Sequence, residues 1–198
     1  KQALFSTGAG RFRNYDQAQR NFERAVERAP EHWMPNYYLG ELALRDDKPD
    51  LARTYLEVAY ALRGDGPPRH PETPKIVDAL AEALYRQGEY PALVGFLTDT
   101  ARLDGSVEGY LRKARYLALI GDPDSALVAY QTAIEVAGDA TPDARLALAD
   151  FYESVGARDK ALIELRRAYA IDPEDKTVNQ RLRAYGVIPG PTMSLPPN

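Results

Sequence analysis

The chain has 198 residues and a mass of 22.0 kDa, enough for one domain that buries about 70% of the surface of its unfolded chain. Its 25 Lys and Arg against 29 Asp and Glu leave a net charge of −4, which argues against nucleic acid as a partner. It has no cysteine, which excludes disulfides and thiolate chemistry, and its apolar runs are too short for membrane insertion. We expect a soluble protein of the cytoplasm rather than of the bacterial periplasm, although the lack of cysteine fits both compartments.

Residues 1–32 are predicted to form a degenerate pair of helices. Apolar residues at helical spacing in 18–26 indicate the second helix, and Pro30 ends it. The first helix would contain Gly8 and Gly10, each about 1 kcal/mol less favourable in a helix than alanine. The alternative for these glycines is a phosphate-binding loop, but a third glycine is missing and no strand precedes them. We therefore expect a frayed or kinked helix here.

Two helices are predicted near 33–45 and 49–62. The first opens with an aromatic-rich turn that contains Trp33, Tyr37 and Tyr38. Aromatic residues at helical spacing usually pack in a core, so we expect Trp33 and Tyr38 to lie between neighbouring helix pairs. Tyr37 is the better candidate for an exposed contact with a ligand.

Residues 67–73 contain three prolines and are predicted to form a stiff loop, because proline opposes a helix. Thr73 and Pro74 fit the N-cap and the first position of the helix that follows. The loop is either a contact site for a partner or a tolerated extension. The third helix pair, residues 74–106, turns at Gly88.

A fourth helix pair is predicted over residues 107–141 and a fifth over residues 142–175. One more helix, residues 177–185, is polar on one side and apolar on the other, and Gly186 closes it. Such a helix would cover the apolar face of the last pair. Residues 187–198 contain four prolines and are expected to be extended or disordered.

These helix pairs recur with a period close to 34 residues. Ala18 and Ala52 are 34 residues apart, as are Phe22 and Leu56. A small residue stands at one position in the first helix of each later pair: Gly40, Ala81, Ala114 and Ala149. Two short helices cannot bury both apolar faces alone, so neighbouring pairs must stack.

The pattern resembles the tetratricopeptide repeat (TPR) family, with its small residue at the eighth position, alanines at the twentieth and twenty-seventh, and proline near the end of the repeat. The resemblance implies an all-α fold, an α-solenoid of about five helix-turn-helix repeats in a right-handed superhelix with a C-terminal capping helix. Residues 1–186 would form a single domain, with a proline-rich tail at 187–198. The repeats would be approximately 1–32, 33–66, 74–106, 107–141 and 142–175, and the capping helix 176–186.

Little in the sequence points to catalysis. His32 and His70 are far apart in the chain and belong to no metal-binding motif. The glycine-serine string at residues 105–109 lacks the strand-turn-helix context of a nucleophile elbow. We therefore expect no enzyme activity, no cofactor and no metal site.

The resemblance instead implies a protein or peptide partner, bound in a concave groove that the first helix of each repeat lines. The corresponding positions are Met34, Tyr37, Glu41, Arg45, Lys75, Asp78, Glu82, Tyr85, Arg86, Glu108, Leu111, Arg115, Leu119, Asp143, Leu146, Asp150 and Glu153. Each of these is either a ligand contact or a solvated residue on a helix exterior.

The two ends of this predicted groove differ in chemistry. Tyr37 and Tyr85 would anchor an apolar or aromatic residue of the partner. Asp150 and Glu153 at the other end have little local cation except Arg115, which favours Lys or Arg in the partner.

Chaperone-binding members of the family hold a C-terminal carboxylate in a clamp of Lys and Asn residues on successive first helices. The matching places here include Asp78, Glu82 and Asp143, which would repel a carboxylate. The resemblance therefore implies an adaptor without the chaperone clamp.

The alternative is the repeat portion of a larger or oligomeric assembly with a structural role, attached to an enzyme domain or packed on another copy. The chain begins as though inside a helix, which favours a truncated larger protein. The terminal helix and the proline-rich tail favour a genuine C-terminus.

Overall fold

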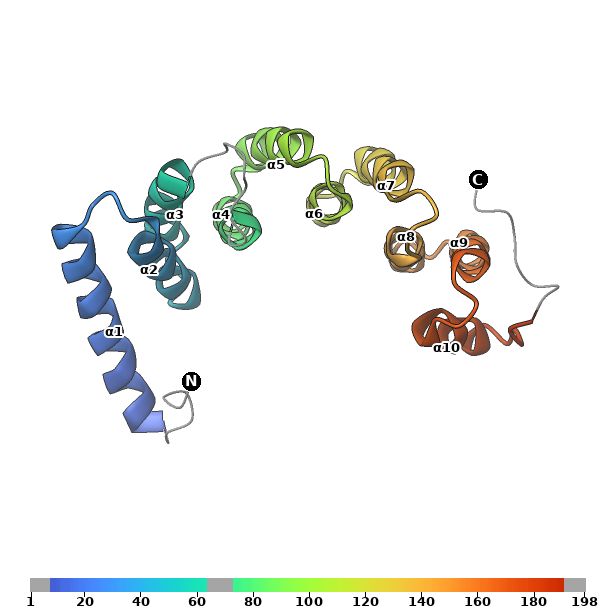
Figure 1. Ribbon diagram of the computed structural model, residues 1–198, viewed down its shortest axis with the longest axis horizontal. Coiled ribbons are helices and arrows are strands. Elements are labelled where there is room, and N and C mark those ends of the chain that lie inside the picture. Colours follow the sequence, from blue (N-terminus) through green and yellow to red (C-terminus); the bar gives the residue numbers. More distant parts are fainter. Residues whose placement is uncertain (1–7, 64–72, 191–198) are drawn as a thin grey trace. The chain divides into compact units, whose positions relative to one another are not determined.

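The computed structural model describes residues 8–63 and 73–190, and only the backbone of residues 8–14. This part of the chain consists of ten helices and contains no strand, which confirms the all-α prediction (Figure 1). In chain order the helices are α1 (Gly8–Arg28), α2 (Trp33–Arg45), α3 (Pro49–Arg63), α4 (Thr73–Gln87), α5 (Tyr90–Asp104), α6 (Val107–Leu119), α7 (Pro123–Ala137), α8 (Asp143–Ser154), α9 (Arg158–Ile171) and α10 (Lys176–Ala184).

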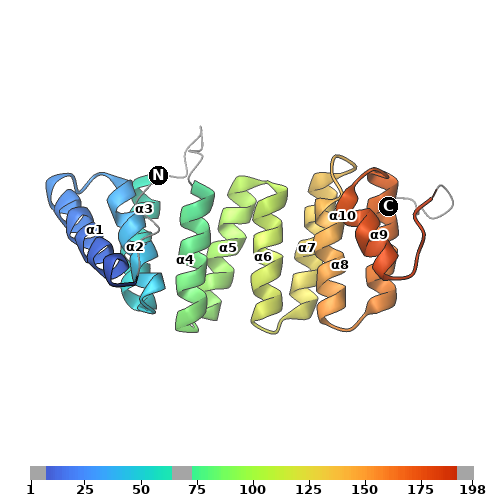
Figure 2. The same cartoon turned by 90° about the horizontal axis from the view of Figure 1, so that it is seen from below.

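The chain divides into two compact units, Lys1–Phe96 and Leu97–Asn198, and the division falls within α5. In the first unit α2 pairs with α3, α1 packs against α2, and α4 contacts both α2 and α3. In the second unit α6 pairs with α7 and α8 with α9, while α10 packs on α9 (Figure 2). The assignment of residues 1–186 to a single domain stays a prediction.

The turn inside each helix pair depends on a residue with left-handed backbone geometry. Gly88, Gly121 and Gly156 have φ angles of 75°, 82° and 76°, and Asp47 takes the same place after α2 with φ 55°. In the turn after α4, the amide of Gly88 donates to the Tyr85 carbonyl at 3.0 Å, which satisfies one of the last carbonyls of that helix. Glycine favours this geometry because it has no Cβ, so these glycines mark the turns in the sequence.

The core of each repeat is made of small and branched residues that let two helices approach closely. Ala52, Leu56 and Ala59 of α3 are fully buried. Gly40 of α2 lies directly against Leu56, and a Cβ at residue 40 would come within 2.7 Å of Leu56 Cδ2. The small residue in the first helix is therefore required by the leucine in the second.

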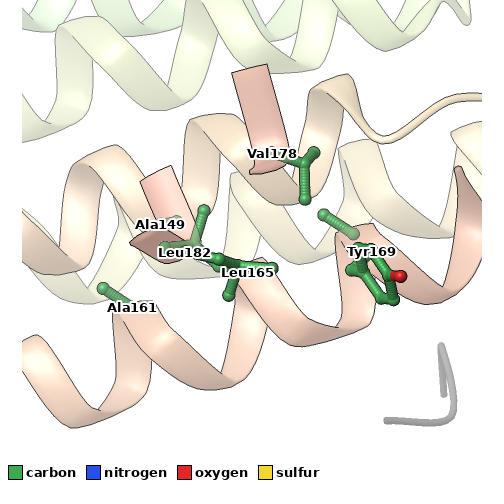
Figure 3. Close-up of a cluster of buried hydrophobic side chains, with 7 residues drawn as sticks. Ala149, Ala161, Leu165, Tyr169, Val178 and Leu182 are labelled. Atoms are coloured by element: carbon green, nitrogen blue, oxygen red, sulfur yellow. The ribbon is translucent and has the colours of Figure 1, made fainter. Parts of the chain in front are cut away.

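The apolar side of α10 completes the core of the second unit, as the sequence predicts. Val178 and Leu182 are 0% exposed and pack in one cluster with Leu165 and Tyr169 of α9 (Figure 3). The Asp175 carboxylate accepts a 2.7 Å hydrogen bond from the Val178 amide, which caps the start of α10. Gly186, with φ 76°, ends it.

Two expectations for the first unit fall at least partly outside the described residues. Within residues 8–28 the structure has the single helix α1 instead of the two helices of a repeat, and this helix begins at Gly8 and continues through Gly10. The part of the expected first helix at residues 1–7 lies outside the described residues. The predicted proline loop at residues 67–73 lies outside the described residues except for Thr73, where α4 begins.

Candidate functional site

The positions nominated for ligand contact lie on four helices, α2 and α4 in the first unit and α6 and α8 in the second. Most of them are exposed or half-buried. The expectation that Leu111 contacts a ligand is wrong. Leu111 is only 4% exposed, because α6 packs on both α7 and α8. It belongs to the core and is not available to a ligand.

The start of α2 carries a cluster of aromatic side chains. Tyr37 lies 5.2 Å from Tyr38 and 6.3 Å from Trp33 between ring centroids. Tyr38 also stacks on Phe22 of α1 at 5.0 Å. Tyr38 is 42% exposed, whereas Tyr37 is half-buried and so less exposed than Tyr38. The expectation that Tyr38 is the core residue and Tyr37 the exposed one is therefore wrong. Met34, also 42% exposed, adds an apolar side chain to this surface.

The two charged positions further along α2, Glu41 and Arg45, differ in their contacts. Arg45 pairs with Asp46 at 2.7 Å, and its guanidinium lies 3.6 Å from the ring centroid of Tyr15 in α1. Glu41 lies between Arg45 and the aromatic cluster. Partial burial raises the pKa of Glu41, although its side chain keeps contact with solvent.

Arg86 of α4 connects two helices of the first unit. Its Nε lies 2.6 Å from Glu82, and its Nη1 donates a 2.8 Å hydrogen bond to the carbonyl of Leu44 in α2. Lys75 and Asp78 are exposed at the start of the same helix. Tyr85 is half-buried, with its ring 6.2 Å from that of Tyr90. Arg86 and Glu82 therefore have a structural role before any ligand is considered.

In α6, Arg115 pairs with Glu108 at 2.9 Å. Leu119, at the end of this helix, is 60% exposed. Asp143 is exposed at the start of α8.

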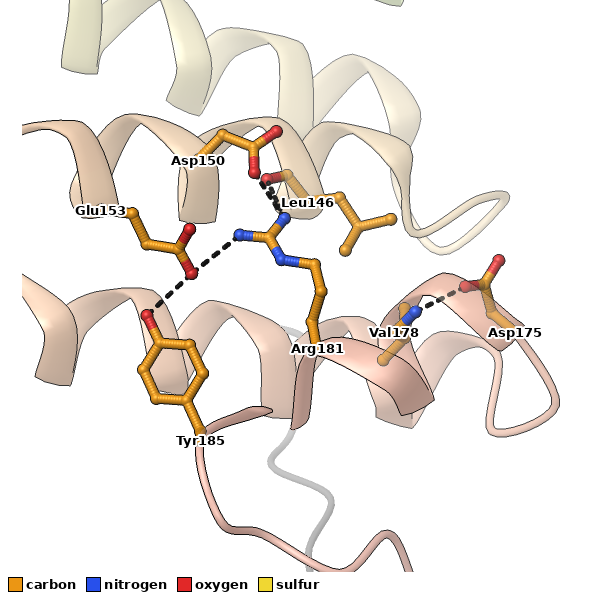
Figure 4. A network of polar contacts seen from close by, with 7 residues as sticks. All are labelled: Leu146, Asp150, Glu153, Asp175, Val178, Arg181 and Tyr185. Atoms are coloured by element: carbon orange, nitrogen blue, oxygen red, sulfur yellow. Dashed lines mark hydrogen bonds and ion pairs between the residues drawn. The ribbon is translucent and has the colours of Figure 1, made fainter. Parts of the chain in front are cut away.

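The remaining α8 positions are occupied by α10. Arg181 donates to the Leu146 carbonyl at 3.4 Å and pairs with Asp150 at 2.5 Å and with Glu153 at 3.0 Å (Figure 4). The expectation of little local cation near Asp150 and Glu153 is therefore wrong. The sequence could not reveal this partner, since Arg181 lies about thirty residues further along the chain and reaches α8 only through tertiary packing.

Tyr185 adds a hydrogen bond to the same network, from its hydroxyl to Glu153 at 2.8 Å (Figure 4). Burial alone would raise the pKa of Glu153, but the hydrogen bond from Tyr185 and the guanidinium of Arg181 outweigh it and lower that pKa. Burial, and then the hydrogen bond to Glu153, raise the pKa of Tyr185. The guanidinium of Arg158 lies 4.6 Å from the Tyr185 ring centroid.

Comparison of the sequence with known families gives a match to the tetratricopeptide repeat over residues 5–67 and 111–176. The chain belongs to the tetratricopeptide repeat family. No curated protein sequence matches it.

Solved structures of TPR proteins share the fold. TTC0263, a thermophilic TPR protein of Thermus thermophilus, is 27% identical, with a TM-score of 0.54 over 86% of this chain and 89% of its own. MamA is 18% identical, with a TM-score of 0.58 over 86% and 98%. YrrB, described as a TPR protein with an unusual peptide-binding site, is 19% identical, with a TM-score of 0.55 over 89% and 86%.

Sequence reasoning missed one feature of the TPR chain, a buried ion pair between α8 and α9. Arg145 of α8 and Glu164 of α9 form an ion pair at 2.9 Å, and Arg167 lies 2.8 Å from the second oxygen of Glu164. The available signal was the helical period itself, because Arg145 occupies a core-facing position next to Leu148 and Ala149.

The described part of the chain contains no group of three or more His, Cys, Asp or Glu residues that could hold a metal ion. None of the helices described here is both long and apolar enough to cross a membrane.

Proposed function

We propose that this TPR chain is a non-catalytic adaptor that binds an extended segment of a partner protein on the exposed faces of its first helices. The observation that supports this most is the apolar surface of α2. Met34 and Tyr38 are each 42% exposed there, next to the half-buried Tyr37. Aromatic residues of this kind supply most of the binding energy in many protein interfaces.

The partner's anchor residue is placed on α2 rather than on α8. In α8, Asp150 and Glu153 already pair with Arg181, so their carboxylates are less available to a basic residue of the partner. An aliphatic or aromatic side chain of the partner would lie against Met34 and Tyr37.

The charges on α4 and α8 support the proposal that the adaptor is not of the chaperone-clamp type. A clamp for a C-terminal carboxylate needs cations, and Asp78 and Asp143 are exposed acids at the matching places. A net charge of −4 supports a protein partner rather than nucleic acid.

The test begins with a pull-down by the immobilised chain, with the bound protein identified by mass spectrometry. Titration calorimetry then compares Tyr37→Ala and the parent on that purified partner. Loss of a tyrosine anchor should weaken binding by about 2 kcal/mol, roughly thirtyfold in Kd. The circular dichroism spectrum should not change, because Tyr37 is only half-buried.

Leu62→Ala is the control, because Leu62 is an exposed apolar residue (39%) on the second helix α3. It should bind like the parent. Parent affinity in Tyr37→Ala together with a loss in Leu62→Ala would move the site to the second helices. Light scattering on the free protein checks the remaining alternative, a second copy as the partner.

A further inference from the structure

The position directly after the small residue of the first helix, the ninth of the repeat, is charged in four repeats: Glu41, Glu82, Arg115 and Asp150. Three of these side chains have a partner of opposite charge within the chain. Glu82 pairs with Arg86 at 2.6 Å, Arg115 with Glu108 at 2.9 Å, and Asp150 with Arg181 at 2.5 Å. Among the described residues, no hydrogen bond or ion pair reaches Glu41.

Glu41 has no partner among the described side chains because Arg45, the expected candidate, makes other contacts. Arg45 lies four residues after Glu41, the spacing at which Glu and Arg pair on a helix. Its guanidinium instead makes two contacts with Asp46, at 2.7 and 3.1 Å, and covers the Tyr15 ring at 3.6 Å. Within the described part of the chain, the carboxylate of Glu41 therefore has no cation beside it.

The surroundings of Glu41 make such a cation favourable. Partial burial raises the pKa of Glu41: its carboxylate has lost part of its hydration, and no described side chain donates a hydrogen bond in exchange. Tyr37 and Tyr38 precede it by one helical turn. An aromatic face attracts a cation and also accepts the aliphatic stem of Lys or Arg.

The second unit shows how a first helix receives a guanidinium. There Arg181 pairs with Asp150, at the ninth position of its repeat, and also donates to the carbonyl of Leu146, one turn earlier (Figure 4). The corresponding residues of α2 are Glu41 and Tyr37. On α2 none of the side chains that the structure describes supplies the cation.

We propose that Glu41 binds a Lys or Arg side chain of the partner segment, with the stem of that side chain against Tyr37. This inference rests on the proposed function. It adds that the partner residue next to the apolar anchor carries a positive charge. A partner segment that pairs an aliphatic residue with a nearby cation would satisfy both Met34 and Glu41.

The test uses two capped tripeptides, acetyl-Leu-Arg-Leu-amide and the same peptide with citrulline, the neutral isostere of arginine. Each is titrated at low ionic strength into the isotopically labelled full chain, and the amide signals of α2 are followed by NMR. The arginine peptide should bind α2 roughly three- to fivefold more tightly than the citrulline peptide, the range of an exposed ion pair. Glu41→Gln should abolish this ratio.

Glu57→Gln is the matched control, because Glu57 is an exposed glutamate of α3 that pairs with Arg53 at 2.7 Å. It should keep the ratio. An equal affinity of both peptides for the parent, a ratio that survives in Glu41→Gln, or no response of α2 to either peptide would each overturn the inference. Equal binding on α2 would leave the proposed function standing, because that function is tested separately by the affinity of Tyr37→Ala for the partner.

Discussion

Nη1 of Arg145 lies 2.9 Å from Oε2 of Glu164, and both side chains are only 7% exposed. The pair joins the two helices of the fifth repeat at a depth where an isolated charge is very unfavourable. Arg167 completes the carboxylate's contacts at 2.8 Å from its other oxygen. The last repeat is therefore held by a buried ionic network in addition to its apolar core.

Removing one member of this network should be severe. Glu164→Ala leaves Arg145 buried without its partner, so the free energy of unfolding should fall by about 3–5 kcal/mol. Urea unfolding measures the change. Glu57→Gln, which breaks the exposed pair with Arg53, should cost less than about 1 kcal/mol. Similar losses in the two variants would contradict the special role of burial.

A second prediction compares two glycines that both lie inside helices. At Gly40 a Cβ would collide with Leu56, so Gly40→Ala should destabilise the chain by about 1–3 kcal/mol. At Gly95 of α5 a Cβ meets nothing within 4 Å, so Gly95→Ala should stabilise it by roughly 0.5–1 kcal/mol. Thermal melting would show the opposite signs, and a gain in both variants would mean that Leu56 can move aside.

The third prediction concerns the turns after α2 and α4, where two substitutions should change stability in opposite directions. Asp47 is held in left-handed geometry at φ 55°, whereas the equivalent residue after α4 is Gly88 at φ 75°. Asp47→Gly relieves this strain and should raise the free energy of unfolding by up to about 1 kcal/mol, while Gly88→Ala should lower it by about 1 kcal/mol. Denaturant melts of both variants test this, and a destabilised Asp47→Gly would imply that its 3.9 Å contact with Arg86 outweighs the strain.

The fourth prediction concerns acid. The pKa of Glu153 is lowered in the folded chain from its ordinary value of 4.5. Its contribution to stability is therefore present above that ordinary value and is lost as the pH falls through the lowered pKa. Between about pH 5 and pH 3 the Tm of the parent should fall more steeply than that of Glu153→Gln.

Tyr185→Phe serves as the second variant in this acid series. It removes the hydroxyl that donates to Glu153, so its Tm profile should lie between those of the parent and Glu153→Gln. Identical slopes in all three proteins would show that the contact between α10 and α8 does not depend on the charge of Glu153.

The sequence by itself determined the family, the all-α class and most helix boundaries. The predicted helix at 33–45 is the observed α2, and the predicted one at 49–62 is one residue short of α3. These features depend on periodicity, on glycine in left-handed turns and on proline at helix starts, all of which act within a few residues of each other.

Only the tertiary structure decided which side chains of the first helices are still available. Leu111 turned inward where α6 packs on two neighbours, and Arg181 reached Asp150 from a helix about thirty residues away. Arg45 turned away from Glu41 toward Asp46 and Tyr15. A repeat pattern assigns a position to a helix face, but the partner of a charged side chain depends on which helix lies across from it. That partner is fixed by packing between residues far apart in the chain, which local periodicity does not encode.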